Sequence, residues 1–422
     1  MLRCVGAFGS CQRPVCGDGE LQIVMRIYLD HSATTPIDER VLEAMLPFLR
    51  DKFGNASSVH QFGQDARAAI DLARRKVASL INARPNEIVF TSGGTEANNL
   101  ALRGICEAVQ KYGRHLIVSA IEHPSVKGVV DYLEKQGWSI TCLPVYEHGI
   151  IRLADVSAAL RADTVLISVM MANNEIGTIQ PVGDIGALVR TERDRGRKQL
   201  WFHTDAVQAA GRLPIDVEAI GCDLMTLSAH KIYAPKGTGA LFIRRGVRLM
   251  PQQIGGHQER ERRAGTESVA NIVAFGAAAE LAGAEMAQRN QHTSELRDRF
   301  ESKVQSRIDD IVFNGERDLR LAHVSNISFR FIEGEGLLIH LDMQGVAVST
   351  GSACSSGTLE PSPVIKALGR DEELARGAIR FSFGKDNTEA DVDYAVEALV
   401  RAVASLREIS PLARDMESVP SA

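Results

Sequence analysis

Short apolar runs alternate with longer amphipathic segments through most of the chain. Short runs predict buried strands, whereas apolar residues spaced three and four apart predict helices. Strands are predicted at Glu87–Thr91, His115–Ser119, Ser139–Leu143, Thr164–Met170, Leu200–Thr204, Leu224–Ser228 and Gly239–Ile243. Helices between them are predicted at Glu96–Tyr112, Ser125–Gln136, Leu153–Leu160 and Gly183–Arg195. This alternation favours an α/β fold with a mainly parallel seven-stranded sheet, which binds ligands at the C-terminal ends of its strands.

The pattern changes after about Glu285. A long polar helix is predicted over Met286–Ile308, then a strand at Ile327–Phe331 and a helix near Gly336–Gln344. A loop rich in Gly, Ser and Cys follows, and then a final strand and helix. This order is typical of a smaller α+β domain.

Two domains are therefore expected, and a length of 422 residues also exceeds what one compact domain usually holds. The large domain is expected at 36–285 and the small domain at 26–35 together with 286–422. The N-terminal strand at 26–30 is assigned to the small domain, because the segment after Thr35 already has a helical pattern. Residues 1–25 have no clear period and are expected to form a disordered extension.

Composition changes this picture little. Hydrophobic residues make up 45% and charged residues 24%, an ordinary globular mixture. A formal net charge of −5 argues against a broad nucleic-acid or membrane surface, which would need clustered Lys and Arg. No uninterrupted apolar run approaches the roughly 20 residues that a membrane-spanning helix needs. We therefore expect neither a direct nucleic-acid partner nor a membrane partner.

The seven cysteines show no paired framework. Their odd number and the lack of a secretion signal favour a reducing cytoplasm. Cys106, Cys142 and Cys222 lie in apolar surroundings and are expected to be buried. Cys4, Cys11 and Cys16 lack CxxC spacing, so no metal site is expected there.

Two predicted strands end on side chains suited to catalysis. One runs into Asp205, which could face a cationic partner such as a protonated pyridine nitrogen or could simply cap the following helical turn. Another runs through Ser228 and His230 into Lys231. Lys231 is a candidate cofactor-binding amine, although a single lysine is usually an exposed surface residue.

Three other strand ends carry polar groups. Gly94 and Thr95 follow a sharp glycine turn at a helix start, which could bind an anion or could be an ordinary capped turn. His123 could stack on a flat ring and move protons, or it could be structural. Asn174 could bind a phenolic oxygen or a substrate carboxylate.

Cys354 lies in Ser352-Ala353-Cys354-Ser355-Ser356-Gly357. Small polar residues and glycine are typical of a mobile loop and do not suit a buried core segment. A reactive thiol on such a loop could accept an atom at one site and transfer it at another.

Taken together, these segments closely resemble the NifS/IscS-like cysteine desulfurases, in the class V aminotransferase group of fold type I pyridoxal-phosphate enzymes. The resemblance covers residues 26 to about 410. The matching segments are YLDHSATTP from Tyr28, FTSGGTEANNLA from Phe90, EHPSV from Glu122, NNEIGTIQP from Asn173, HTDAVQAAGRLPIDV from His203, SAHKIYAPKGTGAL from Ser228, RRAGTES from Arg262 and STGSACSSGTLEPSPVIKALG from Ser349. Thr350 stands where the family frequently has Ser, a conservative departure.

The resemblance implies a role for each matched residue. Lys231 matches the lysine that forms a Schiff base with pyridoxal phosphate, and Cys354 matches the cysteine that accepts sulfur. His123 matches the histidine stacked on the ring, and Asp205 and Gln208 match the partners of the ring nitrogen and the phenolate oxygen. The remaining matches are Gly94, Thr95, Ser228 and His230 in the phosphate site, Thr266 as a phosphate ligand from a second subunit, and Asn174 and Arg380 as groups that orient the substrate carboxylate, with Asn174 also near the cofactor. Without the resemblance Arg380 could be a surface residue of a strand, an interpretation that the family match argues against.

The implied reaction converts L-cysteine to L-alanine and leaves a persulfide on Cys354. The implied partners are a second copy of the chain and a sulfur-acceptor protein such as an iron–sulfur scaffold. The sulfur could serve housekeeping or nitrogenase iron–sulfur clusters or tRNA thiolation. No resident metal is expected, although Cys354 could contact a nascent iron–sulfur cluster. Two alternatives remain open: another fold type I enzyme such as a selenocysteine lyase, or an inactive scaffold for iron–sulfur assembly.

Overall fold

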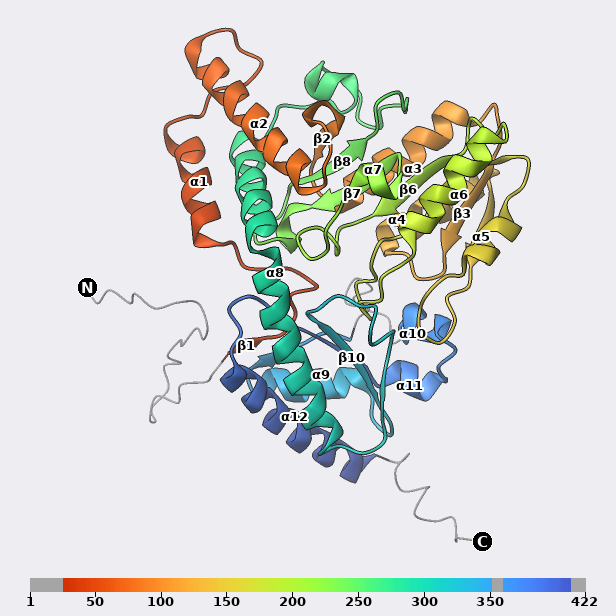
Figure 1. Ribbon diagram of the computed structural model, residues 1–422. Helices are drawn as coiled ribbons and strands as arrows, with labels where there is room; N and C mark the ends of the chain where they lie inside the picture. The colour runs from red at the N-terminus through yellow and green to blue at the C-terminus, as the bar shows by residue number, and fades with distance from the viewer. Residues whose placement is uncertain (1–25, 351–359, 411–422) are drawn as a thin grey trace. The chain divides into compact units, whose positions relative to one another are not determined.

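The computed structural model describes residues 26–350 and 360–410, and the chain divides into two units (Figure 1). Within the described residues, the large unit comprises Thr34–Asn174 and Thr178–Ala287. The small unit comprises 26–33, 288–350 and 360–410, and it also includes the short segment Glu175–Gly177.

The large unit is built on one seven-stranded sheet with the order β2-β8-β7-β6-β5-β3-β4. The strands are β2 (Ile88–Thr91), β3 (His115–Ser119), β4 (Ser139–Leu143), β5 (Thr164–Ser168), β6 (Trp201–Asp205), β7 (Leu224–Ser228) and β8 (Gly239–Ile243). The pairs from β7 to β4 are parallel, and β8 is antiparallel to both β7 and β2. The predicted fold class, with a mainly parallel sheet, is therefore confirmed.

The large unit also contains helices, several of which pack on this sheet through an apolar face. They are α1 (Glu39–Arg50), α2 (Gln61–Leu80), α3 (Gly94–Val109), α4 (Pro124–Lys135), α5 (Leu153–Ala159), α6 (Val182–Asp194) and α7 (Val217–Ile220), with 3-10 turns η1 (Pro85–Glu87), η2 (Ala229–Lys231) and η3 (Gln258–Glu261). Leu100 and Leu102 of α3 and Val129 of α4 share one core with Leu116 and Leu166 of the sheet. This packing fixes the starts of α3 and α4 at the C-terminal ends of the strands that precede them.

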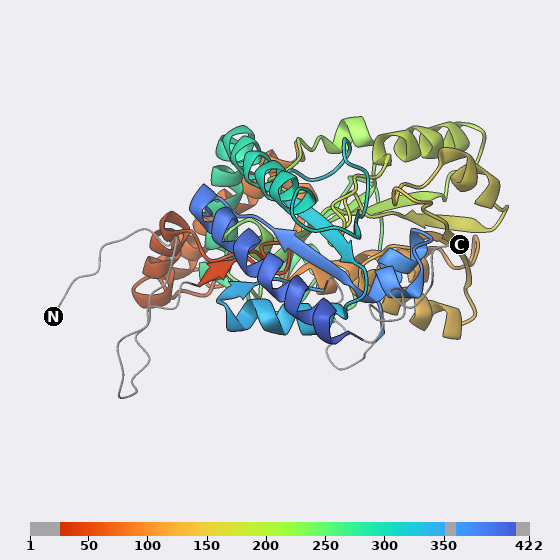
Figure 2. The same ribbon diagram turned by 90° about the horizontal axis from the view of Figure 1, so that it is seen from below.

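The small unit contains a three-stranded antiparallel sheet in the order β12-β10-β9 and a parallel pair of short strands. Its elements are β1 (Ile27–Tyr28), β9 (Ile311–Phe313), β10 (Val324–Phe329), α9 (Gly334–Met343), β11 (Val346–Ala347), α10 (Pro363–Ala367), α11 (Glu372–Arg376), β12 (Ala378–Ser382) and α12 (Glu389–Ile409). Figure 2 shows α12 running beside the last turns of α8 (Val269–Gln305). Asp393 of α12 forms ion pairs with Arg299 (2.7 Å) and Lys303 (2.6 Å) of α8.

Helix α8 begins at Val269, far before the predicted start at Met286. Its first part is rich in alanine and contributes Phe275, Ala278 and Ala282 to the buried core, so it lacks the polar face that marks a surface helix. By length and composition alone, α8 is the one described helix that could cross a membrane. Core helices of globular units meet the same criteria, and the buried residues of α8 fit that interpretation.

One burial prediction was wrong. Cys106 and Cys222 are buried, and burial raises the pKa of both thiols, but Cys142 is exposed. Cys142 lies on β4, an edge strand of the sheet, in which Leu143 is the one buried residue.

Candidate active site

Asp205 ends β6 with a buried carboxylate. The Asn98 side-chain Nδ2 of α3 donates to Asp205 Oδ2 at 2.8 Å, and the Val207 backbone N–H donates to Oδ1 at 2.9 Å. The contact from Val207 is the capping contact that the simpler interpretation predicted. The contact from Asn98 is additional and comes from a different element, so Asp205 is held by more than a local turn.

Lys231 lies in η2, directly after β7, close to two histidines. Burial lowers the pKa of His230 to about 4, and the Lys231 charge contributes to that shift. Burial also lowers the pKa of His123, with the Lys231 charge acting in the same direction and the Asp205 carboxylate opposing it. Both histidines are therefore neutral at pH 7, and Lys231, His123, His230 and Asp205 form one cluster in the large unit.

His123 is the N-cap of α4 and follows β3. Its Nδ1 accepts from the Ser125 backbone N–H at 3.1 Å and lies 2.8 Å from Ser125 Oγ. Pro124 occupies the first helical position, where a backbone N–H would have no partner within the helix and proline has none. The local sequence thus fixes the ring at the end of the strand.

The start of α3 has the form of an anion site. Gly93 has a φ of +153°, which favours glycine, and no side chain caps the first turn. A Cβ on Gly94 would lie 3.6 Å from the Ser228 Cβ and 3.0 Å from a Val207 methyl group, so the helix start and Ser228 are neighbours. Thr95 is exposed at this end, and His230 Nδ1 lies 3.1 Å from Thr34 Oγ1.

The other predicted residues of the large unit lie in different settings. Gln208 is buried in the turn after Asp205. Asn174 is half-buried in the loop of a hairpin that pairs Ala172 with Ile179, and the neighbouring Asn173 Nδ2 donates to the Ile121 carbonyl at 3.0 Å. Thr266 is exposed on the loop that precedes α8.

Arg380 lies on β12 of the small unit, and its side chain is 3% exposed. Its Nη2 contacts Asp30 Oδ1 at 2.6 Å, and its charge opposes the burial that raises the pKa of Glu175. The interpretation of Arg380 as a surface residue is therefore wrong. Cys354 lies outside the described residues.

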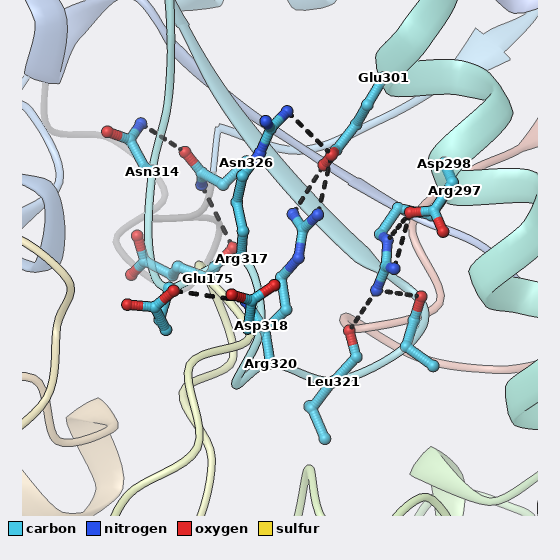
Figure 3. A network of polar contacts seen from close by, with 12 residues as sticks. Glu175, Arg297, Asp298, Glu301, Asn314, Arg317, Asp318, Arg320, Leu321 and Asn326 are labelled. Atoms are coloured by element: carbon cyan, nitrogen blue, oxygen red, sulfur yellow. Dashed lines mark hydrogen bonds and ion pairs between the residues drawn. The ribbon is translucent and has the colours of Figure 1, made fainter.

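The segment Glu175–Gly177, which directly follows Asn174, is anchored within the small unit. Asn326 Nδ2 donates to the Glu175 carbonyl at 3.2 Å, and the Leu321 N–H donates to the Gly177 carbonyl at 2.9 Å. Figure 3 shows this region beside the ion pair that joins Arg320 to Glu301 of α8 at 2.6 Å. The pair is nearly buried, so it fixes the loop that carries Leu321.

Sequence reasoning missed three residues of the site. Asn98 and Ser125 join Asp205 to His123, and Glu122 is buried with Oε1 accepting from Ser119 Oγ (2.5 Å) and the Met170 N–H (2.8 Å). Burial raises the pKa of Glu122 to about 8. A signal for Asn98 was its position one helical turn after Thr95, and a signal for Ser125 was the cap spacing from His123.

Comparison with known proteins places this arrangement in a family. Residues 27–395 match the family model described as aminotransferase class-V. The chain is 49% identical over 385 residues to "Cysteine desulfurase IscS" of Dictyoglomus turgidum (strain DSM 6724 / Z-1310), with 91% of this chain and 96% of that protein covered.

Solved structures of similar proteins support the same family assignment. A "NIFS-LIKE PROTEIN" aligns with a TM-score of 0.84 and 36% identity over 90% of this chain and 100% of that one. "SspA in complex with cysteine" aligns with a TM-score of 0.74 and 35% identity over 86% of this chain and 99% of that one.

Proposed function

Because this chain belongs to the class V aminotransferase family, we propose that it is a pyridoxal-phosphate-dependent cysteine desulfurase. The overall reaction takes the sulfur atom of L-cysteine, leaves L-alanine and converts the Cys354 thiol to a persulfide. The observation that carries the proposal is the cluster of Asp205, Lys231 and His123 in the large unit.

The donor set of the large unit fits pyridoxal phosphate. The uncapped start of α3, with Gly94, Thr95, Ser228 and neutral His230, suits a phosphate group. The buried carboxylate of Asp205 suits a protonated ring nitrogen, because a buried charge needs an opposite charge. When bound, the cofactor supplies an electron sink for carbanion chemistry.

The residues of this chain then have distinct tasks. Lys231 would bind the cofactor and later, as a free amine, remove the Cα proton of L-cysteine. Asp205 would keep the ring nitrogen protonated, with Gln208 donating to the phenolate oxygen. His123, which is neutral at pH 7, would carry a proton to or from the reacting groups.

The substrate and sulfur tasks are assigned to other residues. Arg380 and Asn174 would orient the carboxylate of L-cysteine, since the planar guanidinium matches a carboxylate. The Cys354 thiolate would attack the substrate sulfur, which requires loss of a thiol proton. That "SspA in complex with cysteine" is similar to this chain supports cysteine as the substrate.

The proposed partners are a second copy of the chain, which would receive Thr266 as a phosphate ligand, and a sulfur-acceptor protein for iron–sulfur assembly. The name of the Dictyoglomus turgidum relative, a cysteine desulfurase, supports the release of sulfur for such an acceptor.

The test measures alanine formed from L-cysteine and, with an added thiol reductant that converts the persulfide back to a thiol, the sulfide released. The visible absorbance of the bound cofactor is recorded alongside. Lys231→Ala should lose both the absorbance and turnover, whereas the exposed-lysine control Lys198→Ala should keep both. Cys354→Ala should keep the absorbance and lose sulfur transfer, whereas Cys142→Ala, which removes the exposed thiol of β4, should behave as wild type. Alanine formation at the wild-type rate by Cys354→Ala would refute the persulfide role.

A further inference from the structure

A continuous set of hydrogen bonds joins Asp205 to His123 through two residues with no role in the reaction described above. Asn98 Nδ2 donates to Asp205 Oδ2 at 2.8 Å and to Ser125 Oγ at 2.8 Å. Ser125 Oγ lies 2.8 Å from His123 Nδ1, and the Ser125 backbone N–H donates to the same nitrogen at 3.1 Å. The four residues come from α3, β6 and the start of α4, all within the large unit.

The direction of each bond follows from the chemistry of its ends. A carboxylate only accepts, so the Asn98 amide must turn its two N–H groups toward Asp205 and Ser125. Ser125 Oγ accepts one of them and has its own proton left to donate to His123 Nδ1. A backbone N–H can only donate, so His123 Nδ1 accepts from Ser125 twice.

We propose that Asn98 and Ser125 are positioning residues that hold His123 as the neutral tautomer with its proton on Nε2. The assignment of His123 to the reaction rests on the proposed function, but the tautomer itself rests only on these contacts. His123 would then exchange protons through Nε2, because two donors already occupy Nδ1.

The charges around His123 agree with a neutral ring. Burial of the ring is the largest cause of its lowered pKa, Asp205 on β6 acts in the opposite direction, and Lys231 on η2 acts in the same direction as burial. Glu122, next in the chain, has its pKa raised to about 8 by burial, so it is mostly protonated at pH 7. Removing a donor from Nδ1 should therefore raise the pKa of His123, because donors to Nδ1 stabilise only the neutral ring.

The test is nitrogen NMR of the full-length protein with ¹⁵N-labelled histidine, recorded across pH with and without added pyridoxal phosphate. His123→Asn assigns the signal. Wild type should show a nonprotonated Nδ1 and a protonated Nε2 near pH 7. In Ser125→Ala the midpoint of His123 protonation should rise by about 0.7 pH unit, the equivalent of one net hydrogen bond of about 1 kcal/mol.

Three further variants sharpen the test. Asn98→Ala should shift the midpoint in the same direction, Ser125→Thr should restore it because it keeps the hydroxyl, and Ser157→Ala on the exposed face of α5 should leave it unchanged. The acidic limb of the pH profile of desulfuration should move with the NMR midpoint.

A protonated Nδ1 in the wild type would overturn the proposal, as would a Ser125→Ala variant that loses activity while the His123 signals stay where they are. Failure of the proposed function looks different, because a protein without desulfurase activity would still show the Nε2 tautomer in the NMR spectra.

Discussion

At the scale of single residues, burial rather than pairing decides the charges of the site. Burial is the largest cause of the low pKa of His123 and His230 and of the high pKa of Glu122. All three groups are driven toward their neutral forms, as expected where water cannot solvate a charge. Lys231 therefore lies beside two neutral histidines, in a cluster whose negative charge is the Asp205 carboxylate.

Glu122 gives a prediction about stability and pH. Its pKa is about 8 in the folded protein and 4.5 in an unfolded chain, so the folded protein binds more protons between these values. Its stabilising contribution is complete below pH 4.5 and is lost as the pH rises through 8, with a slope of about 1.4 kcal/mol per pH unit. Glu122→Gln should remove this slope, as measured by urea unfolding between pH 5 and 9.

The control for that measurement is Glu134→Gln, on an exposed position of α4. The difference between each variant and wild type isolates the mutated group from other titrating residues. A Glu122→Gln curve parallel to wild type across the whole pH range would show that Glu122 is ionised in the folded protein.

At the scale of elements, the strands of the large sheet and the four helices predicted between them could be located from periodicity, whereas the start of α8 and the loop at η3 could not. Each strand of the large sheet is a short, mainly apolar run, and its observed bounds lie within two residues of the predicted ones. The start of α8 was missed because its alanines are buried on several sides and leave no polar stripe. The loop at η3 was not predictable either, since Glu259, Arg260 and Glu261 all have positive φ values, which are uncommon for residues other than glycine.

That loop is held by a buried ion pair. Arg74 of α2 contacts both Glu259 carboxylate oxygens at 2.7 Å, and Glu259 also accepts from the Phe90 N–H at 3.0 Å. Glu259→Gln would leave the Arg74 charge buried beside a neutral group, so we expect a loss of about 3 kcal/mol or more in the free energy of unfolding. This loss in the free energy of unfolding is measured by denaturant unfolding.

An exposed pair provides the comparison. Arg161 and Asp163 contact each other at 2.9 Å with side chains 49% and 40% exposed, so Asp163→Asn should cost less than about 1 kcal/mol. Equal losses for the two variants would mean that the Arg74–Glu259 pair is not buried in solution.

At the scale of the whole molecule, the predicted site residues belong to two units. The motifs that suggested cofactor residues in the large unit follow the ends of strands, where such folds bind ligands, and the strands do end there in the structure. The roles of those residues stay predictions. The motifs did not predict that Glu175–Gly177 belongs to the small unit, or that Asn98 and Ser125 join Asp205 to His123. The place of Glu175–Gly177 and the contacts of Asn98 depend on segments far apart in the chain, which no local pattern records. The contact between Ser125 and His123 is local, and only its cap spacing was visible in the sequence.

This division suggests that substrate binding can be weakened without loss of the cofactor. Arg380 lies in the small unit, whereas Lys231, Asp205 and the start of α3 lie in the large one. Arg380→Lys keeps the positive charge beside Asp30 but loses the planar guanidinium that matches a carboxylate. We expect the KM for L-cysteine to rise about tenfold, the equivalent of about 1.4 kcal/mol, with the visible absorbance of the cofactor unchanged.

Arg401→Lys, on an exposed position of α12, should leave both quantities at wild-type values. Thermal unfolding distinguishes a lost substrate contact from a damaged fold, because only the second lowers Tm. If Arg380→Lys bleached the cofactor while KM stayed constant, Arg380 would belong to cofactor binding. The division of tasks between the units would then have to be redrawn, because a residue of the small unit would be holding the cofactor.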